Sequence, residues 1–449
     1  MGAGVSAPEC LRPASTFIDQ TMHYQSPISP GHSWYEASLA ERPRYPTLDG
    51  SRQADVVIIG GGFTGLSAAA HLAAAGVDVT LIEAHRLGDG ASGRNGGQLN
   101  TGQRAWPEEL EIEYGFTRAK ALFDLAEDAK QHLFDFSATH DIDIEYMPGQ
   151  MSLAHKPRYV KDYRAHAEIL ATRFDYPHIS FMDAEETAKR LGSTRYFGGT
   201  RDTGTGHIHP MKLVVGTARV AAAAGAHLFE NTQATNIASN AGKVMVTTPS
   251  GTITAQKCLI AVNAYGGNLE PISAAHVMPI GSFIGATVPL GDDSPVLPGG
   301  ESVDDSRFVV RYFRRSRDGR LLFGGREVYA VDDPKDIPQQ IQRQIAEIFP
   351  GLGNVEITHA WGGFVGITMP RQPFVREVMP DVISASGYSG HGVMLSNFVG
   401  KLYAETVTGN TDRLKLFKDL KIPAFPGGRR LRAPLLFLAL NWYALRDRI

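Results

Sequence analysis

Three glycines and one acidic residue have the types and spacing that bind a dinucleotide. Gly60, Gly62 and Gly65 stand in G-x-G-x-x-G spacing, which allows a tight turn, a close approach of backbone to a pyrophosphate and tight packing of a helix. Glu83 follows 18 residues after Gly65, where a carboxylate accepts hydrogen bonds from ribose hydroxyls. The set predicts a dinucleotide site; a glycine-rich turn in another kind of α/β protein is the alternative. Further residues expected at this site are Phe63, Thr64 and Ala84.

A second loop of small residues, 90–97, follows the acid. Because small side chains leave the backbone accessible, its amides are expected to line another part of the same cofactor. The glycines at 60–65 do not separate FAD from NAD, and this loop carries that choice. Its residues expected at the cofactor are Ser92, Gly93, Arg94, Asn95, Gly96 and Gly97.

The hydrophobic pattern predicts the elements that position these residues. Residues 56–59 are a continuous β-branched run, as expected of a strand buried on both faces of a parallel sheet. Residues 66–73 carry apolar side chains at helical spacing, and Gly76 ends that helix. Residues 77–82 form a second strand that ends at Glu83. The pattern is a βαβ unit with the glycines at its first turn.

Further elements follow from the same patterns. Apolar positions recur at helical spacing over 108–140, after Pro210 as far as Gly225, and in a last long helix that starts beside Gly392 and stops at Gly409. Strands are expected at 227–229, 243–248, 252–255, 257–262, 307–313 and 320–325, with a turn at 317–319.

Composition excludes several classes of function. The chain has 449 residues with 44 Lys+Arg, 47 Asp+Glu and a net charge of -3, so nucleic acid is not an expected partner. Only Cys10 and Cys258 are present, which favours a reducing compartment and a cytoplasmic location. The sequence holds no run of 18 or more apolar residues, so no transmembrane segment is expected.

Several motifs together resemble one superfamily. The segments 90–97, 361–364 and 388–392 resemble those of the glycine, sarcosine and D-amino acid oxidase (DAO) superfamily of FAD enzymes. The segments 91–99, 206–210, 390–392 and 425–429 look specifically like γ-glutamylputrescine oxidases and their relatives. The resemblance runs from about Trp34 to the C-terminus.

The resemblance implies an α/β fold, α+β overall, of the glutathione-reductase-like DAO type. A Rossmann-type FAD-binding domain is expected from residues 54–105, 205–275 and 355–425. An antiparallel-sheet substrate domain is expected from 106–204 and 276–354. Residues 1–53 are read as an N-terminal arm and 426–449 as a C-terminal tail.

The resemblance also implies further cofactor contacts. They are Ala234, Ala261, Gly363, Ser389, Gly390, His391, Gly392 and Val393. The FAD is expected to be non-covalent, because 363–373 contain no Cys and 92–99 contain no His, the residue types that covalent relatives use there.

Three residues are catalytic candidates, one of them at the start of the last helix. His391 is assigned to flavin or substrate contact, with a capping histidine as the alternative. Trp361 and Arg326 are the other catalytic candidates. The expected substrate residues are Tyr312, Arg311, Trp361, Phe364 and Tyr388, for which core packing or a structural salt bridge is the alternative. No metal site is expected: His207 and His209 have i, i+2 spacing but lack a third ligand.

Two positions depart from what relatives carry. Val365 stands where α-amino acid oxidases place an Arg, so the oxidised carbon is expected to bear no carboxylate. Leu322 stands where sarcosine oxidases place an oxygen-activating Lys, so oxygen use is expected to be slow unless Arg326 or His391 replaces it.

The sequence therefore predicts FAD-dependent oxidation of a small-molecule amine, γ-glutamylputrescine or a related substituted alkylamine, to an imine and then an aldehyde. The alternatives are an α-amino acid oxidase or dehydrogenase of the same superfamily and a non-catalytic flavin-binding subunit. Oxygen or another molecule accepts the electrons, and homo-oligomerisation is left open.

Overall fold

The β-branched run Val56–Ile59 forms strand β3 inside a six-stranded sheet, and all four of its residues are buried. The computed structural model describes residues 26–29, 31–240, 242–328 and 336–428, without the side chains of 326–328. The sheet order is β18-β19-β12-β3-β4-β8, parallel except for the β18–β19 pair. The other strands are β4 (Val79–Ile82), β8 (His227–Phe229), β12 (Lys257–Ile260), β18 (Phe374–Met379) and β19 (Val382–Ser386).

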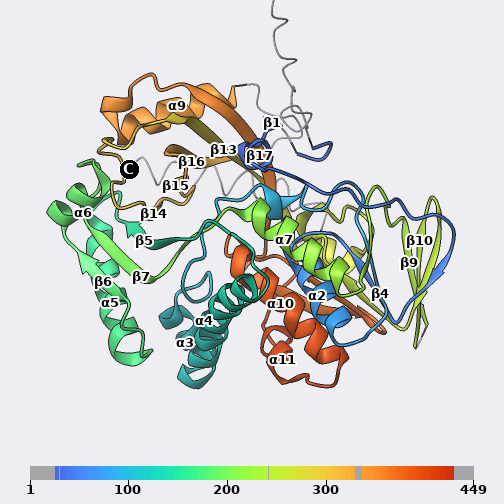
Figure 1. Cartoon of the computed structure of the whole chain (residues 1–449). Helices are drawn as coiled ribbons and strands as arrows, with labels where there is room; N and C mark the ends of the chain where they lie inside the picture. Colours follow the sequence, from blue (N-terminus) through green and yellow to red (C-terminus); the bar gives the residue numbers. More distant parts are fainter. Residues whose placement is uncertain (1–25, 30, 241, 329–335, 429–449) are drawn as a thin grey trace, which may run out of the picture.

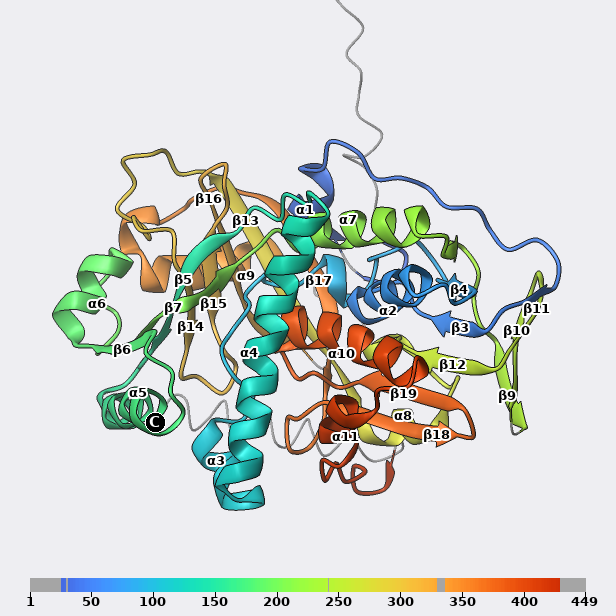
Figure 2. The ribbon, with the colours of Figure 1, turned by 60° about the horizontal axis from the view of Figure 1, so that its bottom comes forward.

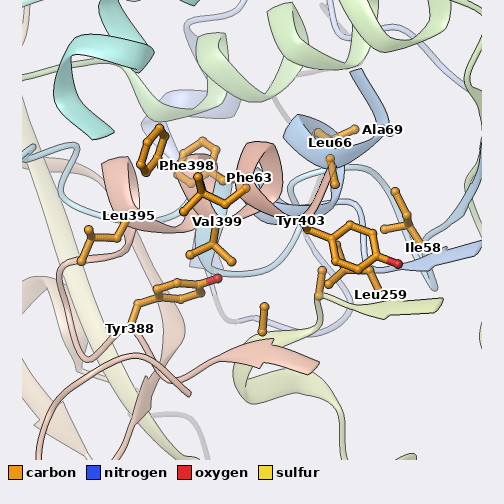
Figure 3. Close-up of a cluster of buried hydrophobic side chains, with 14 of the residues drawn as sticks. Ile58, Phe63, Leu66, Ala69, Leu259, Tyr388, Leu395, Phe398, Val399 and Tyr403 are labelled. Atoms are coloured by element: carbon orange, nitrogen blue, oxygen red, sulfur yellow. The ribbon is translucent and has the colours of Figure 1, made fainter. Parts of the chain in front are cut away.

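Helices α2 (Phe63–Ala74), α10 (Gly392–Val407) and α7 (Pro210–Ala223) pack beside this sheet. Side chains from α2, α10, β3 and β12, including Leu66, Val399, Ile58 and Leu259, form the buried cluster shown in Figure 3. At Gly400 a side chain would collide with the backbone of α2, so glycine allows the two helices to approach closely. The predicted βαβ unit is therefore confirmed, with its helix packed against the sheet between α7 and α10 (Figure 2).

A small four-stranded sheet lies at one end of the molecule, at the right of Figure 1. Its order is β2-β11-β10-β9, and β10 and β11 contact β12 and β3. The strands are β2 (Arg52–Gln53), β9 (Asn236–Asn240), β10 (Lys243–Thr248) and β11 (Gly251–Ala255).

A nine-stranded sheet forms the other half of the molecule, with order β1-β17-β13-β16-β15-β14-β5-β7-β6. All neighbours are antiparallel except β14 and β5. Helix α9 (Ile337–Ile348) buries Ile341 and Ile345 against β13, β16 and β17. The strands are β1 (Gly31–His32), β5 (Met147–Leu153), β6 (Ile179–Met182), β7 (Gly199–His207), β13 (Met278–Pro289), β14 (Ser302–Asp305), β15 (Tyr312–Arg315), β16 (Arg320–Val328) and β17 (Ile357–Ile367).

The remaining helices cover the edges of the two larger sheets, and Figure 2 shows α4 running along the junction between them. They are α1 (Trp34–Ala37), α3 (Pro107–Tyr114), α4 (Phe116–Thr139), α5 (Val160–Arg173), α6 (Ala184–Leu191), α8 (Pro271–His276) and α11 (Asp412–Lys418). Single 3-10 turns lie at Ala91–Gly93, Pro157–Tyr159, Asn263–Tyr265 and Pro350–Leu352. No helix within the described ranges has the length and apolar composition to cross a membrane.

Two expectations about elements need correction. The helix expected over 108–140 is two helices, because Gly115 has φ 80 and ends α3 where α4 starts. The strand expected at 307–313 begins only at Tyr312, because the backbone amides of Arg307 and Arg311 both donate to the Asp305 carboxylate and fold the segment into a turn.

Strand β17 lies near one of the expected domain boundaries. β17 pairs along its length with β13 in the nine-stranded sheet, whereas residues 355–425 were assigned to the cofactor domain together. Residues 357–367 therefore pack with the antiparallel sheet, and the chain returns to the six-stranded sheet at β18.

Candidate active site

The turn between β3 and α2 is shaped by glycines that leave no room for a side chain. Gly60 has φ +111, and a Cβ there would lie 2.6 Å from the Ala261 carbonyl oxygen. A Cβ at Gly65 would collide with the Gly60 carbonyl. Gly62 is the N-cap of α2 and has no side chain to cap it. The helix N-terminus therefore presents amides and a positive dipole end, which suit a pyrophosphate.

Glu83 lies directly beside this turn. Its Oε2 accepts a hydrogen bond from the amide of Gly61 at 2.8 Å, and its Oε1 accepts one from the amide of His85 at 3.0 Å. Burial raises the pKa of the Glu83 carboxyl, and these amides partly offset that rise. The carboxylate is thus fixed at the end of β4, with the half-buried Ala84 next to it.

The small-residue loop predicted over 90–97, here taken as the 91–98 loop, is joined to α2 and held in shape by its own polar groups. Ser92 Oγ accepts a hydrogen bond from the Phe63 amide at 2.9 Å. Asn95 Nδ2 donates to the carbonyls of Ala91 and Ser92, and its Oδ1 accepts from the Gly97 amide. The structure therefore brings together the two glycine-rich segments that the sequence singles out.

Arg94 ties this loop to β17 and to the N-terminal segment. Its guanidinium donates to the carbonyls of Gly362 and Gly31, each at 2.9 Å. The Trp361 indole N–H donates back to the Arg94 carbonyl at 3.1 Å. Because it bonds backbone carbonyls in this way, Arg94 acts as a structural link near the cofactor loop.

A cavity of about 1020 Å³ lies between the 91–98 loop, the start of α10, and strands β5, β13, β14 and β17. One wall is rich in glycine and backbone amides: it includes Gly96, Gly97, Gly363, Ser389, Gly390 and His391. The adjoining wall is apolar, since the cross-strand pairs Met278–Ile367 and Ile280–Val365 both line it. Another part of the lining, called the polar end below, holds Arg104, Gln150 and Asp304.

His391 immediately precedes α10 and its side chain lines the cavity. Its Nδ1 is buried and has no hydrogen-bond partner within the described residues. Burial holds the pKa of His391 well below its ordinary value, and the nearby charge of Arg104 lowers that pKa further. The neutral imidazole therefore lines the cavity, while its unused Nδ1 is itself buried and is not open to the cavity.

Some of the other expected cofactor residues line this cavity, whereas Ala234 and Ala261 lie outside its lining. Ser389 and Gly390 have positive φ angles of 54° and 96° and turn the chain into α10, where Gly392 is the first helical residue. Val393 lines the cavity. The Ala261 amide donates to the Ile59 carbonyl beside Gly60. Ala234 is half-buried between β8 and β9.

Only two of the four aromatic residues expected to contact the substrate line the cavity. Tyr312 and Phe364 line the cavity, and the Tyr312 hydroxyl lies 3.1 Å from Ser282 Oγ. Trp361 is fully buried, and neither it nor Tyr388 is among the cavity-lining residues. Tyr388 belongs to the apolar cluster of Figure 3, where its hydroxyl lies 3.0 Å from Thr64 Oγ1. The structure gives Trp361 and Tyr388 the core positions that were their alternative.

Neither arginine expected at the substrate or the flavin is found in the cavity lining of the described residues. Arg311 forms an ion pair with Glu347 of α9 and is not among the cavity-lining residues. The Arg326 side chain lies outside the described residues. Leu322 is buried and does not line the cavity either. The salt-bridge alternative therefore describes Arg311.

His207 and His209 bond other parts of the protein. His207 Nε2 donates to the Gly300 carbonyl at 2.9 Å and its Nδ1 faces Arg314 at 3.3 Å. His209 caps α7 by accepting from the Lys212 amide. In the ranges that the structure describes, no three His, Cys, Asp or Glu side chains gather as metal ligands.

Sequence reasoning missed the polar end of the cavity. Gln150 lies on β5 and Asp304 on β14, neighbouring parallel strands that pair Ser152 with Asp304. Neither strand was predicted. Arg104 gave the only usable indication among the three, because it is a charged residue a few positions after the predicted cofactor loop.

Comparisons with known proteins identify this architecture. The FAD dependent oxidoreductase (DAO) family model matches residues 55–406. The chain is 65% identical to a probable oxidoreductase OrdL of Rhizobium meliloti over 427 residues, covering 95% of this chain and 100% of the relative. It is 34% identical to γ-glutamylputrescine oxidoreductase of Escherichia coli over 420 residues, covering 93% and 98%.

A solved structure supports the fold. The glycine oxidase of Geobacillus kaustophilus superposes with a TM-score of 0.69 at 21% identity, covering 83% of this chain and 97% of that one. The glycine cradle at Gly60–Gly65, the fixed Glu83 and the amide-rich cavity wall fit a bound FAD. The chain therefore belongs to the DAO family of FAD-dependent oxidoreductases.

Proposed function

We propose that this enzyme oxidises the terminal amine of γ-glutamylputrescine, or of a related substituted alkylamine, to an imine that water hydrolyses to an aldehyde. Bound FAD supplies the acceptor for the hydride equivalent that leaves the carbon beside nitrogen. The protein must bind the amine, orient its carbon and keep the surroundings free of groups that would favour other substrates.

The apolar wall is the observation that carries the proposal. Ile280 and Val365 pair across two strands and line the cavity next to Gly363 and Phe364. A carboxylate on the oxidised carbon would lose its water against this wall without a partner, which costs on the order of several kcal/mol. An alkyl chain that ends in an amine is compatible with the wall, whereas an α-amino acid is not.

His391 is suited to orient the amine. Its imidazole is held neutral, so an unprotonated ring nitrogen would accept a hydrogen bond from a neutral amine N–H once the ring turns that nitrogen toward the cavity. The N-terminus of α10 lies at the glycine-rich wall of the cavity. Its backbone amides and positive dipole end would stabilise negative charge on a bound, reduced flavin.

The similarity to a γ-glutamylputrescine oxidoreductase over nearly the whole chain supports the same substrate class. The similarity to glycine oxidase structures, at 21% identity, supports only the fold. The scarcity of cysteine supports a cytoplasmic location.

Anaerobic stopped-flow mixing tests the proposal. We expect γ-glutamylputrescine to bleach the flavin with a kcat/KM above those for glycine, sarcosine and D-alanine. The proposal fails if any of these three amino acids exceeds both γ-glutamylputrescine and putrescine. If no amine bleaches the flavin, a non-catalytic flavin-binding role replaces it. Reoxidation of the bleached enzyme by air, compared with reoxidation by an artificial quinone, decides whether oxygen is the acceptor.

Acid precipitation tests how the cofactor is held. We expect the yellow colour to remain in the supernatant, because no Cys lies at 363–373 and no His lies at 92–99. Colour that stays with the precipitated protein contradicts non-covalent binding.

A further inference from the structure

The polar end of the cavity holds a hydrogen-bond acceptor that nothing in the described chain uses. Gln150 Nε2 donates to Asn100 Oδ1 at 3.0 Å and to Asp304 Oδ2 at 2.6 Å. Both amide hydrogens are therefore engaged, which fixes Gln150 Oε1 as an acceptor. This oxygen has almost no accessible surface and no partner within the described residues, and because Gln150 lines the cavity a small turn of the side chain would present the oxygen to a ligand.

Arg104 lies on the same cavity with its charge unused. Within the described residues its guanidinium forms no hydrogen bond or ion pair. Arg94, by contrast, bonds backbone carbonyls, and Arg307 pairs with Asp305. A guanidinium is a planar fork whose donors match the two oxygens of a carboxylate.

Asp304 supplies the opposite charge. Burial raises its pKa to about 6, while hydrogen bonding from Ser152 and the charge of Arg104 act to lower it. Arg104 also lowers the pKa of His391, so its guanidinium lies within electrostatic reach of both residues. No ion pair within 4.0 Å joins Arg104 to Asp304 among the described residues, and the two charges remain available to a ligand between them.

These groups match a zwitterion. An ammonium has three donors and no acceptor, and it would find the Asp304 carboxylate and Gln150 Oε1 together. A carboxylate beside it would find Arg104. We propose that this polar end is a subsite for the α-ammonium and α-carboxylate of an amino acid head group, carried at the opposite end of the substrate from the oxidised amine.

This subsite rests on the proposed function, because it names what the substituted end of the alkylamine carries. It also explains how one cavity takes a substrate with a carboxylate although the wall at Val365 is apolar. Arg104 would bind this carboxylate, and the apolar wall at Val365 would face the reacting carbon.

Four amides of putrescine test the subsite in the purified holoenzyme. They carry the γ-glutamyl group, a 4-aminobutanoyl group that lacks the carboxylate, a glutaryl group that lacks the ammonium, and a butanoyl group that lacks both. We expect wild-type enzyme to prefer the γ-glutamyl amide over each single deletion by about 10- to 100-fold in kcat/KM, since each removes a charge-assisted hydrogen bond.

Two variants assign the charges. In Arg104→Ala the preference over the 4-aminobutanoyl amide should fall close to one, while the preference over the glutaryl amide persists. In Asp304→Asn the reverse should hold. Arg413→Ala, which removes an exposed arginine paired with Asp128, should keep all the wild-type ratios. Because each ratio is taken within one variant, a partial loss of folded enzyme cancels.

Failure of the subsite and failure of the function give different results. If none of the four amides bleaches the flavin, the proposed function is wrong. If all are oxidised but both variants lower the four kcat/KM values equally, or leave the ratios unchanged, the enzyme is an amine oxidoreductase without this subsite. Should Arg104→Ala not bind FAD, Arg104→Lys is used, and it must still weaken the preference over the 4-aminobutanoyl amide because the bidentate fork is lost.

Discussion

The cofactor side, which starts at the β3–α2 turn, and the substrate side of the cavity are built from different parts of the chain. The cofactor side is backbone, held close by glycines such as Gly60 and Gly65 where any side chain would collide. The substrate side is made of side chains that project from strands, such as Val365 and Asp304. A substitution on the cofactor side disturbs the backbone itself, whereas one on the substrate side changes shape and charge and leaves the strands in place. The first side fixes the chemistry and the second selects the molecule.

Gly65→Ala should break the cofactor side completely. Its new methyl group would meet the Gly60 carbonyl, and the backbone cannot yield without opening the β3–α2 turn. We expect loss of bound FAD, measured as the ratio of flavin absorbance to protein, together with a lower Tm. Gly351→Ala, where no atom lies within 4 Å of the added Cβ, serves as the matched control. A normal flavin content in Gly65→Ala would mean that the turn relaxes.

Val365→Arg should alter the substrate side and leave FAD bound. The guanidinium would replace an apolar side chain opposite Ile280 and place an unpaired charge beside the alkyl chain of the substrate. We expect kcat/KM for γ-glutamylputrescine to fall by at least about tenfold, because an unpaired charge meets the substrate in a desolvated cavity. Val365→Met preserves the apolar wall and should change kcat/KM far less. Equal losses in both variants would assign the effect to side-chain size.

Asp304→Asn should trade stability against function. The pKa of Asp304 is raised from 3.8 to about 6, mainly by burial. Between those pH values the folded protein holds a proton that the unfolded chain has lost, so this group makes the free energy of unfolding fall as pH rises. At pH 7.5 the variant should be more stable than wild type, by on the order of 1 to 3 kcal/mol. The gain should shrink toward pH 4.

Calorimetric Tm at pH 7.5 and pH 4.5 measures this effect. Asp381→Asn is a control of opposite sign, because the Gly242 amide holds the pKa of Asp381 below its ordinary value. Its carboxylate stabilises the protein above the unfolded pKa, and that contribution is lost as pH falls, so the variant should lose stability at pH 7.5. A Tm of Asp304→Asn below wild type at pH 7.5 would contradict the argument.

Tyr312→Phe should have the smallest effect, since Tyr312 lies where the two sides meet. Its ring packs against Gly96 and Gly324, and its hydroxyl lies 3.1 Å from Ser282 Oγ. Removing that hydrogen bond should cost about 0.5 to 1.5 kcal/mol in unfolding free energy and leave the flavin spectrum unchanged. A displaced flavin absorbance band would show that the hydroxyl contacts the cofactor.

The cofactor side could be predicted from the sequence because its contacts are local. Gly60, Gly65 and Glu83 belong to one βαβ unit, and Ser92 reaches Phe63 from only 29 positions away. The spacing alone therefore determines how these residues meet.

The substrate side could not be predicted in the same way. Gln150 and Asp304 are 154 positions apart, and only the pairing of β5 with β14 brings them together. Residue type does not fix the direction of a side chain: Trp361 and Tyr388 are aromatic residues in the expected segments, yet both face the core. The direction of Arg311 depends on Glu347, on a helix that the pattern did not reveal.

The order of strands in the six-stranded sheet bears on how the protein is made. β3 emerges early from the ribosome, but its two neighbours are β4, which follows at once, and β12, which is about 200 residues later and in turn pairs with β19. Until β12 appears, one edge of an entirely apolar strand lacks its partner, a condition that favours aggregation. Helix α10, which completes both the core and the cavity wall, comes later still. We therefore expect the nascent chain to depend on chaperones, and flavin to be loaded only when translation is nearly complete.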